Sequence, residues 1–197
     1  MRLFVAAEIG ETLAARAAEL SRELQRRAAD AAPRAKVTWV PAGRLHLTVR
    51  FIGEIDDGRA AAVGEALEPP LDVAPFDLTL AGAGAFPTRG SPRVLWIGVA
   101  SGRDELVAAE RAISARLARL GIPEEGRPYN PHLTLARVRE PAGLRSARVL
   151  EGLTGRALGT VHIDAITLFH SRLSPKGPTY TPLQRIPMGG SEDPPLH

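Results

Sequence analysis

The chain has 197 residues, of which 25 are lysine or arginine and 22 are aspartate or glutamate, so its formal net charge is +3. It contains no cysteine, which excludes disulfide bonds, thiolate metal ligands and cysteine nucleophiles. No apolar run approaches the length of a signal peptide or a membrane span, and we expect a cytoplasmic protein without membrane contact. Nearly all of the positive charge is arginine, which mildly favours a phosphate-bearing partner.

The first part of the chain has the pattern of a strand, a helix and two further strands. Leu3–Ala7 is a short apolar run typical of a buried strand. The next segment has the apolar spacing of one face of an amphipathic helix, at Leu13, Ala17, Leu20 and Leu24. Val37–Val40 predicts a strand, and Leu45–Ile52, bounded by turn residues, predicts another that contains His46.

A later part of the chain repeats this order. Val94–Val99 predicts a strand, and a helix that ends at Gly121 is marked by Leu106, Ile113, Leu117 and Leu120. A loop rich in glycine and proline then leads to a strand that starts at His132. Leu3 and His46 are 43 positions apart and Val94 and His132 are 38 apart, so the sequence predicts an internal duplication.

The remaining elements complete an α+β fold with largely antiparallel sheets. They are a short helix at Asp57–Leu67 and strands at Phe76–Phe86, Val161–Leu173 and Tyr180–Ile186. We expect one domain over residues 1–188 and a disordered tail over residues 189–197.

A His-Leu-Thr tripeptide occurs twice, at residues 46–48 and 132–134, at the end of each repeated unit. Because alternate residues of a strand share a face, the histidine and threonine of each tripeptide point the same way and the leucine points to the core. The same alternation places Arg50 beside His46 and directs Phe51 into the core. A single tripeptide would mean little, but two at equivalent positions indicate a functional pair.

Two such histidines suit acid–base chemistry, because one imidazole can accept a proton while another donates one near neutral pH. His46 and His132 could flank a phosphodiester, one activating water and the other protonating the leaving oxygen. The hydroxyls of Thr48 and Thr134 would hold the non-bridging phosphate oxygens. Metal binding is the competing use of histidine, but two histidines without a third ligand make a poor zinc site, so we expect no metal and no other cofactor.

Aromatic side chains could stack on a nucleic-acid base, and four are candidates: Trp39, Trp96, Tyr129 and Tyr180. Trp96 lies within a buried-strand pattern and is expected in the core. Trp39 and Tyr129 are close to the motif strands in sequence and are preferred.

Two further histidines, His162 and His170, lie on the predicted strand Val161–Leu173. Their even spacing would place them on one face of that strand. We interpret both as structural or surface histidines.

On these motifs the chain resembles the two-histidine phosphoesterases, and within them the bacterial and archaeal RNA 2′,3′-cyclic phosphodiesterases, formerly called 2′-5′ RNA ligases. The similarity spans nearly the whole chain, through Arg2–Ala6, His46–Glu54, Pro131–Arg137 and Ser171–Tyr180. It implies a bilobal α+β fold in which two pseudo-symmetric lobes, with helices packed outside, face each other across an active-site groove.

The resemblance further implies hydrolysis of an RNA 2′,3′-cyclic phosphate to a 2′-phosphomonoester without metal, with His46 as proton donor and His132 as proton acceptor. The partners would be RNA ending in a 2′,3′-cyclic phosphate, or cyclic nucleotides, and we expect a monomer. Two alternatives stay open. The same pair run backwards would perform reversible 2′-5′ RNA ligation, and the groove could instead bind RNA ends without turnover.

Arg137 matches an arginine that is associated with phosphate binding in the family, and a guanidinium group suits that task. Strict alternation, however, places Arg137 on the face of Leu133 and Leu135, away from His132. Arg137 could reach the phosphate only through a β-bulge or at a strand end. The alternative is a surface arginine.

Overall fold

The computed structural model describes residues 1–175 and 177–189, so the tail expected at 189–197 lies outside the described residues apart from Gly189. In chain order the elements are β1 (Arg2–Ala7), α1 (Gly10–Ala31), β2 (Lys36–Trp39), a 3-10 turn (Ala42–Arg44), β3 (Leu47–Glu54), α2 (Asp57–Leu67), β4 (Phe76–Phe86), β5 (Val94–Ser101), α3 (Arg103–Ala118), β6 (His132–Glu140), α4 (Ser146–Val149), β7 (Ala157–Ile163), β8 (Ala165–Arg172) and β9 (Thr179–Pro187). None of the helices in this part of the chain is long and apolar enough to cross a bilayer.

The strands form two antiparallel sheets, which confirms the predicted fold class. One sheet has the strand order β3-β1-β8-β9 and the other β2-β6-β5-β4-β7. In the first sheet β1 pairs with β3, and in the second β5 pairs with β6. In both sheets, therefore, the strand that opens a repeated unit lies beside the strand that carries its motif.

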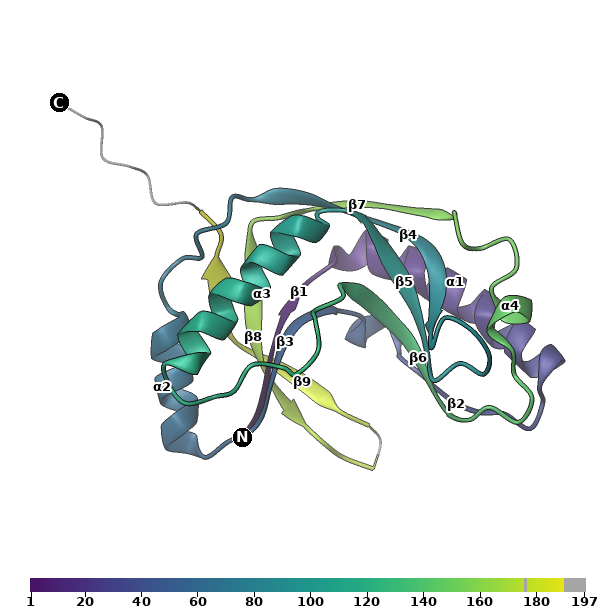
Figure 1. The fold of residues 1–197 in the computed structure, drawn as a ribbon, viewed down its shortest axis with the longest axis horizontal. Coiled ribbons are helices and arrows are strands. Elements are labelled where there is room, and N and C mark those ends of the chain that lie inside the picture. Colours follow the sequence, from purple (N-terminus) through teal and green to yellow (C-terminus); the bar gives the residue numbers. More distant parts are fainter. Residues whose placement is uncertain (176, 190–197) are drawn as a thin grey trace.

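The two long helices are exchanged between the sheets. α1 follows β1 along the chain but makes its main contacts with β7 and α4, and α3 follows β5 but contacts β3 and α2. Figure 1 shows the result, with α1 and α4 at one end of the molecule and α2 and α3 at the other. β2 crosses over as well, because it pairs with β6. Each repeated unit thus covers the sheet of the other.

Helix boundaries follow the local sequence. α2 begins after Asp56, whose carboxylate accepts a hydrogen bond from the backbone N–H of Arg59 at 2.9 Å. α3 ends at Ala118, earlier than the predicted end at Gly121. The intervening residues form a turn in which Gly121 has a φ of 70°, a conformation that glycine adopts without a steric penalty.

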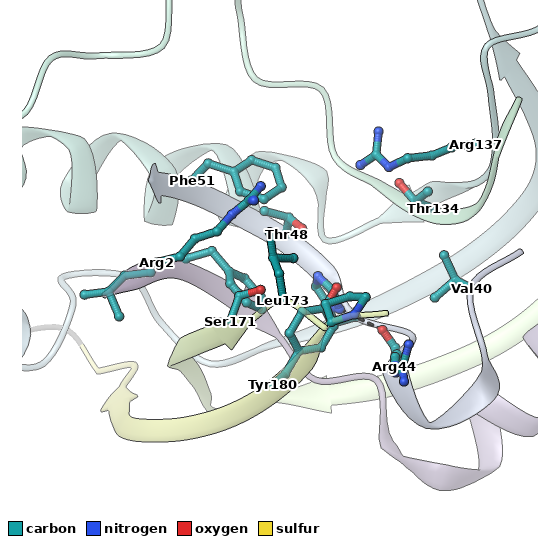
Figure 2. A pocket seen from close by; sticks show the side chains of 14 residues that line it. Arg2, Val40, Arg44, Thr48, Phe51, Thr134, Arg137, Ser171, Leu173 and Tyr180 are labelled. Carbon is teal, nitrogen blue, oxygen red and sulfur yellow. Dashed lines mark hydrogen bonds between the residues drawn. The ribbon is translucent and has the colours of Figure 1, made fainter. Parts of the chain in front are cut away.

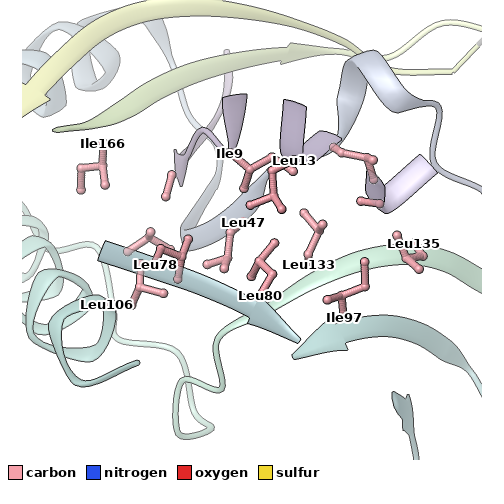
Figure 3. Packing of buried hydrophobic residues seen from close by; sticks show 14 of the residues in the cluster. Ile9, Leu13, Leu47, Leu78, Leu80, Ile97, Leu106, Leu133, Leu135 and Ile166 are labelled. Atoms are coloured by element: carbon pink, nitrogen blue, oxygen red, sulfur yellow. The ribbon is translucent and has the colours of Figure 1, made fainter. Parts of the chain in front are cut away.

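The leucines at the centre of the two tripeptides are buried in the same core. Leu47 and Leu133 have no solvent exposure, and Figure 3 shows both among the clustered side chains of the sheets and helices. Burial of one such side chain contributes about 1.5–3 kcal/mol. The predicted apolar faces of the helices are also buried, at Leu13, Ala17, Leu20 and Leu24 of α1 and at Leu106, Ile113 and Leu117 of α3. Each motif is therefore anchored from beneath.

Two differences from the predicted strands change where histidines lie. His46 lies one residue before β3 rather than inside the strand. The segment predicted as one strand at Val161–Leu173 breaks at Asp164 into β7 and β8, because the chain passes there from one sheet to the other. His162 and His170 therefore do not share a face.

Candidate active site

The imidazoles of His46 and His132 are held by the same backbone contact. Nδ1 of His46 lies 2.8 Å from the carbonyl oxygen of Arg44, and Nδ1 of His132 lies 2.7 Å from that of Asn130. Because a carbonyl oxygen can only accept, Nδ1 carries the proton in both rings. The lone pair of each neutral ring is then on Nε2, which can accept a proton or, once protonated, donate one.

Aromatic rings surround both imidazoles. The ring-centroid distances are 5.0 Å for His46 with both Phe4 and Tyr180, 5.2 Å for His132 with Phe86, and 6.3 Å for His132 with Trp96. These rings exclude water from one side of each histidine, which disfavours the charged imidazolium.

The surroundings lower the pKa of both histidines. Burial is the main cause, the positive charge of Arg137 adds to the lowering, and the hydrogen bonds to the carbonyls of Arg44 and Asn130 oppose it. Since Arg137 acts on both rings, its guanidinium lies within electrostatic reach of His46 and His132 together.

A β-bulge in β6 determines where Arg137 points. The pairing of β6 with β5 skips Leu135, and Leu135 and Ala136 are both fully buried. The alternation is therefore reset, and Arg137 lines the groove together with His132 and Thr134. The structure thus contains the bulge that the sequence requires if Arg137 is to lie on the same side as His132.

β3 contains an equivalent bulge, and it overturns one prediction. Its pairing with β1 skips Val49, so Arg50 turns inward and is only 2% exposed, whereas Phe51 lines the groove and is 48% exposed. The prediction that placed Arg50 beside His46 and Phe51 in the core is wrong, because alternation holds only in a regular strand. Phe51 and Arg137 occupy equivalent positions, five residues after their histidines.

The two motifs line one groove. It consists of a cavity of about 410 Å³ beside His46 and a cavity of about 680 Å³ beside His132. Four residues line both cavities: Thr48, Phe51, Thr134 and Arg137. Figure 2 shows Thr134 and Arg137 on one wall, opposite Thr48 and Phe51 on the other. Two hydroxyls, a guanidinium and an exposed ring thus lie between the histidines.

The groove is basic. Its described lining includes five arginines, at positions 2, 44, 93, 127 and 137, and one carboxylate, Glu125. An array of this kind attracts phosphate groups and can bind their oxygens. Among the residues that the structure describes, no group of three or more histidine, aspartate or glutamate side chains is arranged to hold a metal ion.

The aromatic candidates are placed differently from the prediction. Tyr129 and Tyr180 line the groove, but Trp39 lines neither cavity and packs against the core. Trp96 was expected in the core, yet it pairs across the strands with Thr134 and lies beside His132. The position of Trp96 beside His132 is not visible in the sequence. Its neighbours Leu95 and Ile97 are buried, so an apolar residue between them reads as part of a buried strand.

The other candidates lie away from the groove, and some groove residues are missed by sequence reasoning. His162 is exposed and its Nδ1 is 2.8 Å from Asp77, and His170 pairs across the strands with Leu3. Neither is among the described residues of the groove, in keeping with their interpretation as structural or surface histidines. Of the missed residues, Phe51 could be found from its equivalence to Arg137. Arg2 and Arg44 carry no comparable sequence signal.

The fold is that of LigT-like phosphoesterases. A solved structure from Thermus thermophilus has a TM-score of 0.74 and 30% identity, covering 97% of this chain and 100% of that one. E. coli LigT in complex with 3′-AMP has a TM-score of 0.68 and 27% identity, covering 95% and 97%.

The family model described as the 2′-5′ RNA ligase superfamily matches residues 13–174, and the chain belongs to this family. A curated relative from Aeropyrum pernix named RNA 2′,3′-cyclic phosphodiesterase is 34% identical over 75% of this chain and 84% of its own length. A relative of the same name from Thermus thermophilus is 37% identical over 77% and 75%. The resemblance found in the paired tripeptides is thereby confirmed.

Proposed function

We propose that the protein hydrolyses RNA 2′,3′-cyclic phosphates to 2′-phosphomonoesters by acid–base catalysis between His46 and His132, without a metal ion. The observation that carries this proposal is the placement of two equivalent imidazoles on either side of two threonines and Arg137. The names of the curated relatives, and the binding of 3′-AMP by E. coli LigT, support RNA as the substrate class.

In the proposed reaction the cyclic phosphate lies at the centre of the groove. The hydroxyls of Thr48 and Thr134 and the guanidinium of Arg137 bind its non-bridging oxygens, where negative charge accumulates in the transition state. Nε2 of neutral His132 takes a proton from a water molecule as the water oxygen attacks phosphorus. Nε2 of protonated His46 gives its proton to the 3′ oxygen as the bond from phosphorus to that oxygen breaks.

The charges in the groove suit these two roles. The lowered pKa of His132 keeps its ring neutral at neutral pH, as a general base requires. The negative charge of the bound phosphate offsets Arg137 and favours the protonated form of His46. After one turnover His46 is neutral and His132 is protonated, and proton exchange with solvent restores both.

Residues beside the reaction centre can bind the rest of the RNA. The exposed ring of Phe51 offers a face on which a base can stack. The arginines at positions 2, 44, 93 and 127 lie on both sides of the centre, where they can contact backbone phosphates.

Reversible 2′-5′ RNA ligation is the second candidate, favoured by the description of the matching family model. In this reaction the 5′-hydroxyl of a second RNA takes the place of water, so His132 accepts its proton and His46 again gives a proton to the leaving 3′ oxygen. A third possibility, binding of RNA ends without turnover, would leave the paired histidines without a use.

Product analysis on one defined RNA separates these functions. The purified protein is incubated with an RNA that ends in a 2′,3′-cyclic phosphate and with a second RNA that carries a 5′-hydroxyl, with and without EDTA. We expect a 2′-phosphomonoester at the same rate in both conditions. Joined RNA would indicate ligation, binding without product would indicate a binding module, and activity that EDTA abolishes and zinc or manganese restores would contradict the metal-free mechanism.

A further inference from the structure

Arg50 has no role in the proposed reaction, yet its charge is buried between the two halves of the site. Its side chain is 2% exposed. Nη2 donates a hydrogen bond to the carbonyl oxygen of Pro123, and Nη1 lies 3.6 Å from the Glu125 carboxylate. Nε and Nη1 have no hydrogen-bond partner among the described residues. Burying a charge that is not fully paired costs free energy of folding. We therefore expect Arg50 to serve a function at this position.

Pro123 and Glu125 belong to the loop of residues 122–131, and two more contacts join this loop to β3. The Glu125 carboxylate accepts a hydrogen bond from the backbone N–H of Phe51 at 3.2 Å, and the Tyr129 hydroxyl donates to the carbonyl of Thr48 at 2.9 Å. Burial raises the pKa of Tyr129, so its hydroxyl keeps the proton that it donates. In the described part of the chain β3 is an edge strand, and these contacts satisfy groups on that edge. We call Arg50, Glu125 and Tyr129 the clamp.

The clamp acts on the segment that delivers the second histidine. Tyr129, Asn130 and Pro131 immediately precede His132, and the Asn130 carbonyl holds its Nδ1. At the other side of the clamp, Thr48 and Phe51 belong to the strand that follows His46. The clamp is therefore a direct connection between the first motif and the loop that leads into the second.

We propose that Arg50 is a positioning residue, which fixes His132 relative to His46 by holding the loop of residues 122–131 against β3. The inference rests on the proposed function, because positioning matters only if both histidines act on one phosphate. A displacement of about 1 Å at a reacting group can reduce a rate by about a hundredfold. A clamp of buried, directional contacts restricts such displacement.

The proposal separates activity from stability. Arg50→Met removes an incompletely paired buried charge, and no unpaired charge is left buried, because the side chain of its partner Glu125 is 50% exposed. Arg50→Met is therefore expected to leave the melting temperature unchanged or raise it, while kcat for cyclic-phosphate hydrolysis falls about tenfold or more and KM changes less than about twofold. If Arg50 were merely structural, activity would follow stability.

Arg59→Met is the matched control. Arg59 Nη2 donates to the carbonyl of Leu120 at 3.1 Å, so it also holds the segment after α3, but at its far end from the groove. This variant is expected to keep the wild-type kcat. An equal loss of kcat in both variants, or an unchanged kcat in Arg50→Met, would overturn the assignment.

Histidine NMR titration provides a readout that does not depend on activity. In Arg50→Met, release of the loop should expose His132 and raise its pKa towards the ordinary value, while the pKa of His46 stays the same. Unchanged titration of both histidines would argue against the clamp. If the wild-type protein hydrolyses no cyclic phosphate, the proposed function fails, and the titration still tests the positioning.

Glu125→Gln and Tyr129→Phe test the same clamp should Arg50→Met fail to fold. Both substitutions nearly keep the volume of the side chain, and both leave Arg50 unchanged. Each is expected to lower kcat and to raise the pKa of His132. Wild-type kinetics and titration in both variants would contradict the proposal.

Discussion

His46 and His132 are shaped by the same three influences: a backbone carbonyl at Nδ1, aromatic rings around the imidazole, and the charge of Arg137. The first fixes the tautomer and the other two lower the pKa. Two rings from different sheets therefore have nearly the same electrostatic setting. The different roles that we propose for them would come from the bound substrate, which would place water on one side and the leaving oxygen on the other.

This setting predicts the pH dependence of the reaction. The base must be neutral, so kcat/KM falls as pH drops below its pKa, and the acid must be protonated, so kcat/KM falls as pH rises above its pKa. Since both values are lowered, the wild-type profile should be bell-shaped with a maximum below about 6.5, the ordinary histidine pKa. In Arg137→Met a nearby positive charge is lost, both pKa values rise, and the maximum should move to higher pH. A maximum that stays in place in a pH–rate profile would show that Arg137 does not act on the histidines.

Phe51 predicts a separate effect on substrate binding. Loss of a stacked aromatic ring weakens single-stranded nucleic-acid binding by about five- to a hundredfold. Phe51→Ala should raise KM for an RNA substrate by a factor in this range with a smaller change in kcat. Leu183→Ala is the control, because Leu183 is 45% exposed and lies on β9, away from the residues that line the groove. Equal KM values in the two variants would exclude Phe51 as a stacking surface.

At the scale of single elements, the sequence predicts the strands and helices but not the bulges. The predicted alternation of side chains is correct up to Thr48 and Thr134. Val49 and Leu135 are then extra residues in the strand pairing, so the side chains that follow them point to the opposite faces from those predicted. These residues are apolar and buried in either arrangement, so no pattern marks them. Burial of Arg50 and exposure of Phe51 depend on tertiary pairing for this reason. The phosphate-binding role proposed for Arg137 was suggested by family resemblance and not by the strand pattern.

β4 supports the groove through the absence of a side chain. Gly84 pairs with Trp96, and a Cβ at position 84 would overlap the indole ring, which lies beside His132. Gly84→Ala should therefore displace Trp96 and lower the free energy of unfolding by about 1–3 kcal/mol, as overpacking does. Urea denaturation followed by tryptophan fluorescence measures this. Gly155→Ala, where a Cβ would meet nothing within 4 Å, should leave the midpoint unchanged, and equal midpoints for both variants would contradict the account.

At the scale of the whole molecule, the repeated order of elements was predictable, but the exchange of helices was not. The apolar faces of α1 and α3 are visible in the sequence, and both are buried as predicted. The spacing of apolar residues predicts which face of a helix is buried, but it does not predict which sheet or helix that face packs against. The contacts of α1 with β7 and of α3 with β3 depend on long-range packing.

The exchange predicts cooperative unfolding. Each sheet is covered by a helix from the other half of the chain, so it loses that helix if the other half unfolds. The two halves should therefore unfold in one transition. Trp39 and Trp96 report on the five-stranded sheet, and far-ultraviolet circular dichroism reports on the helices. Urea transitions by the two probes should coincide. Two separate midpoints would show that the halves are independent.

The central claim is that two histidines share one acid–base reaction, and hydrolysis rates of histidine variants test it most directly. On an RNA ending in a 2′,3′-cyclic phosphate, His46→Ala and His132→Ala should each lower kcat by about 10²–10⁴-fold while circular dichroism shows a folded protein. His162→Ala, which removes an exposed histidine paired with Asp77, should retain the wild-type rate. Wild-type activity in either His46→Ala or His132→Ala would contradict the account.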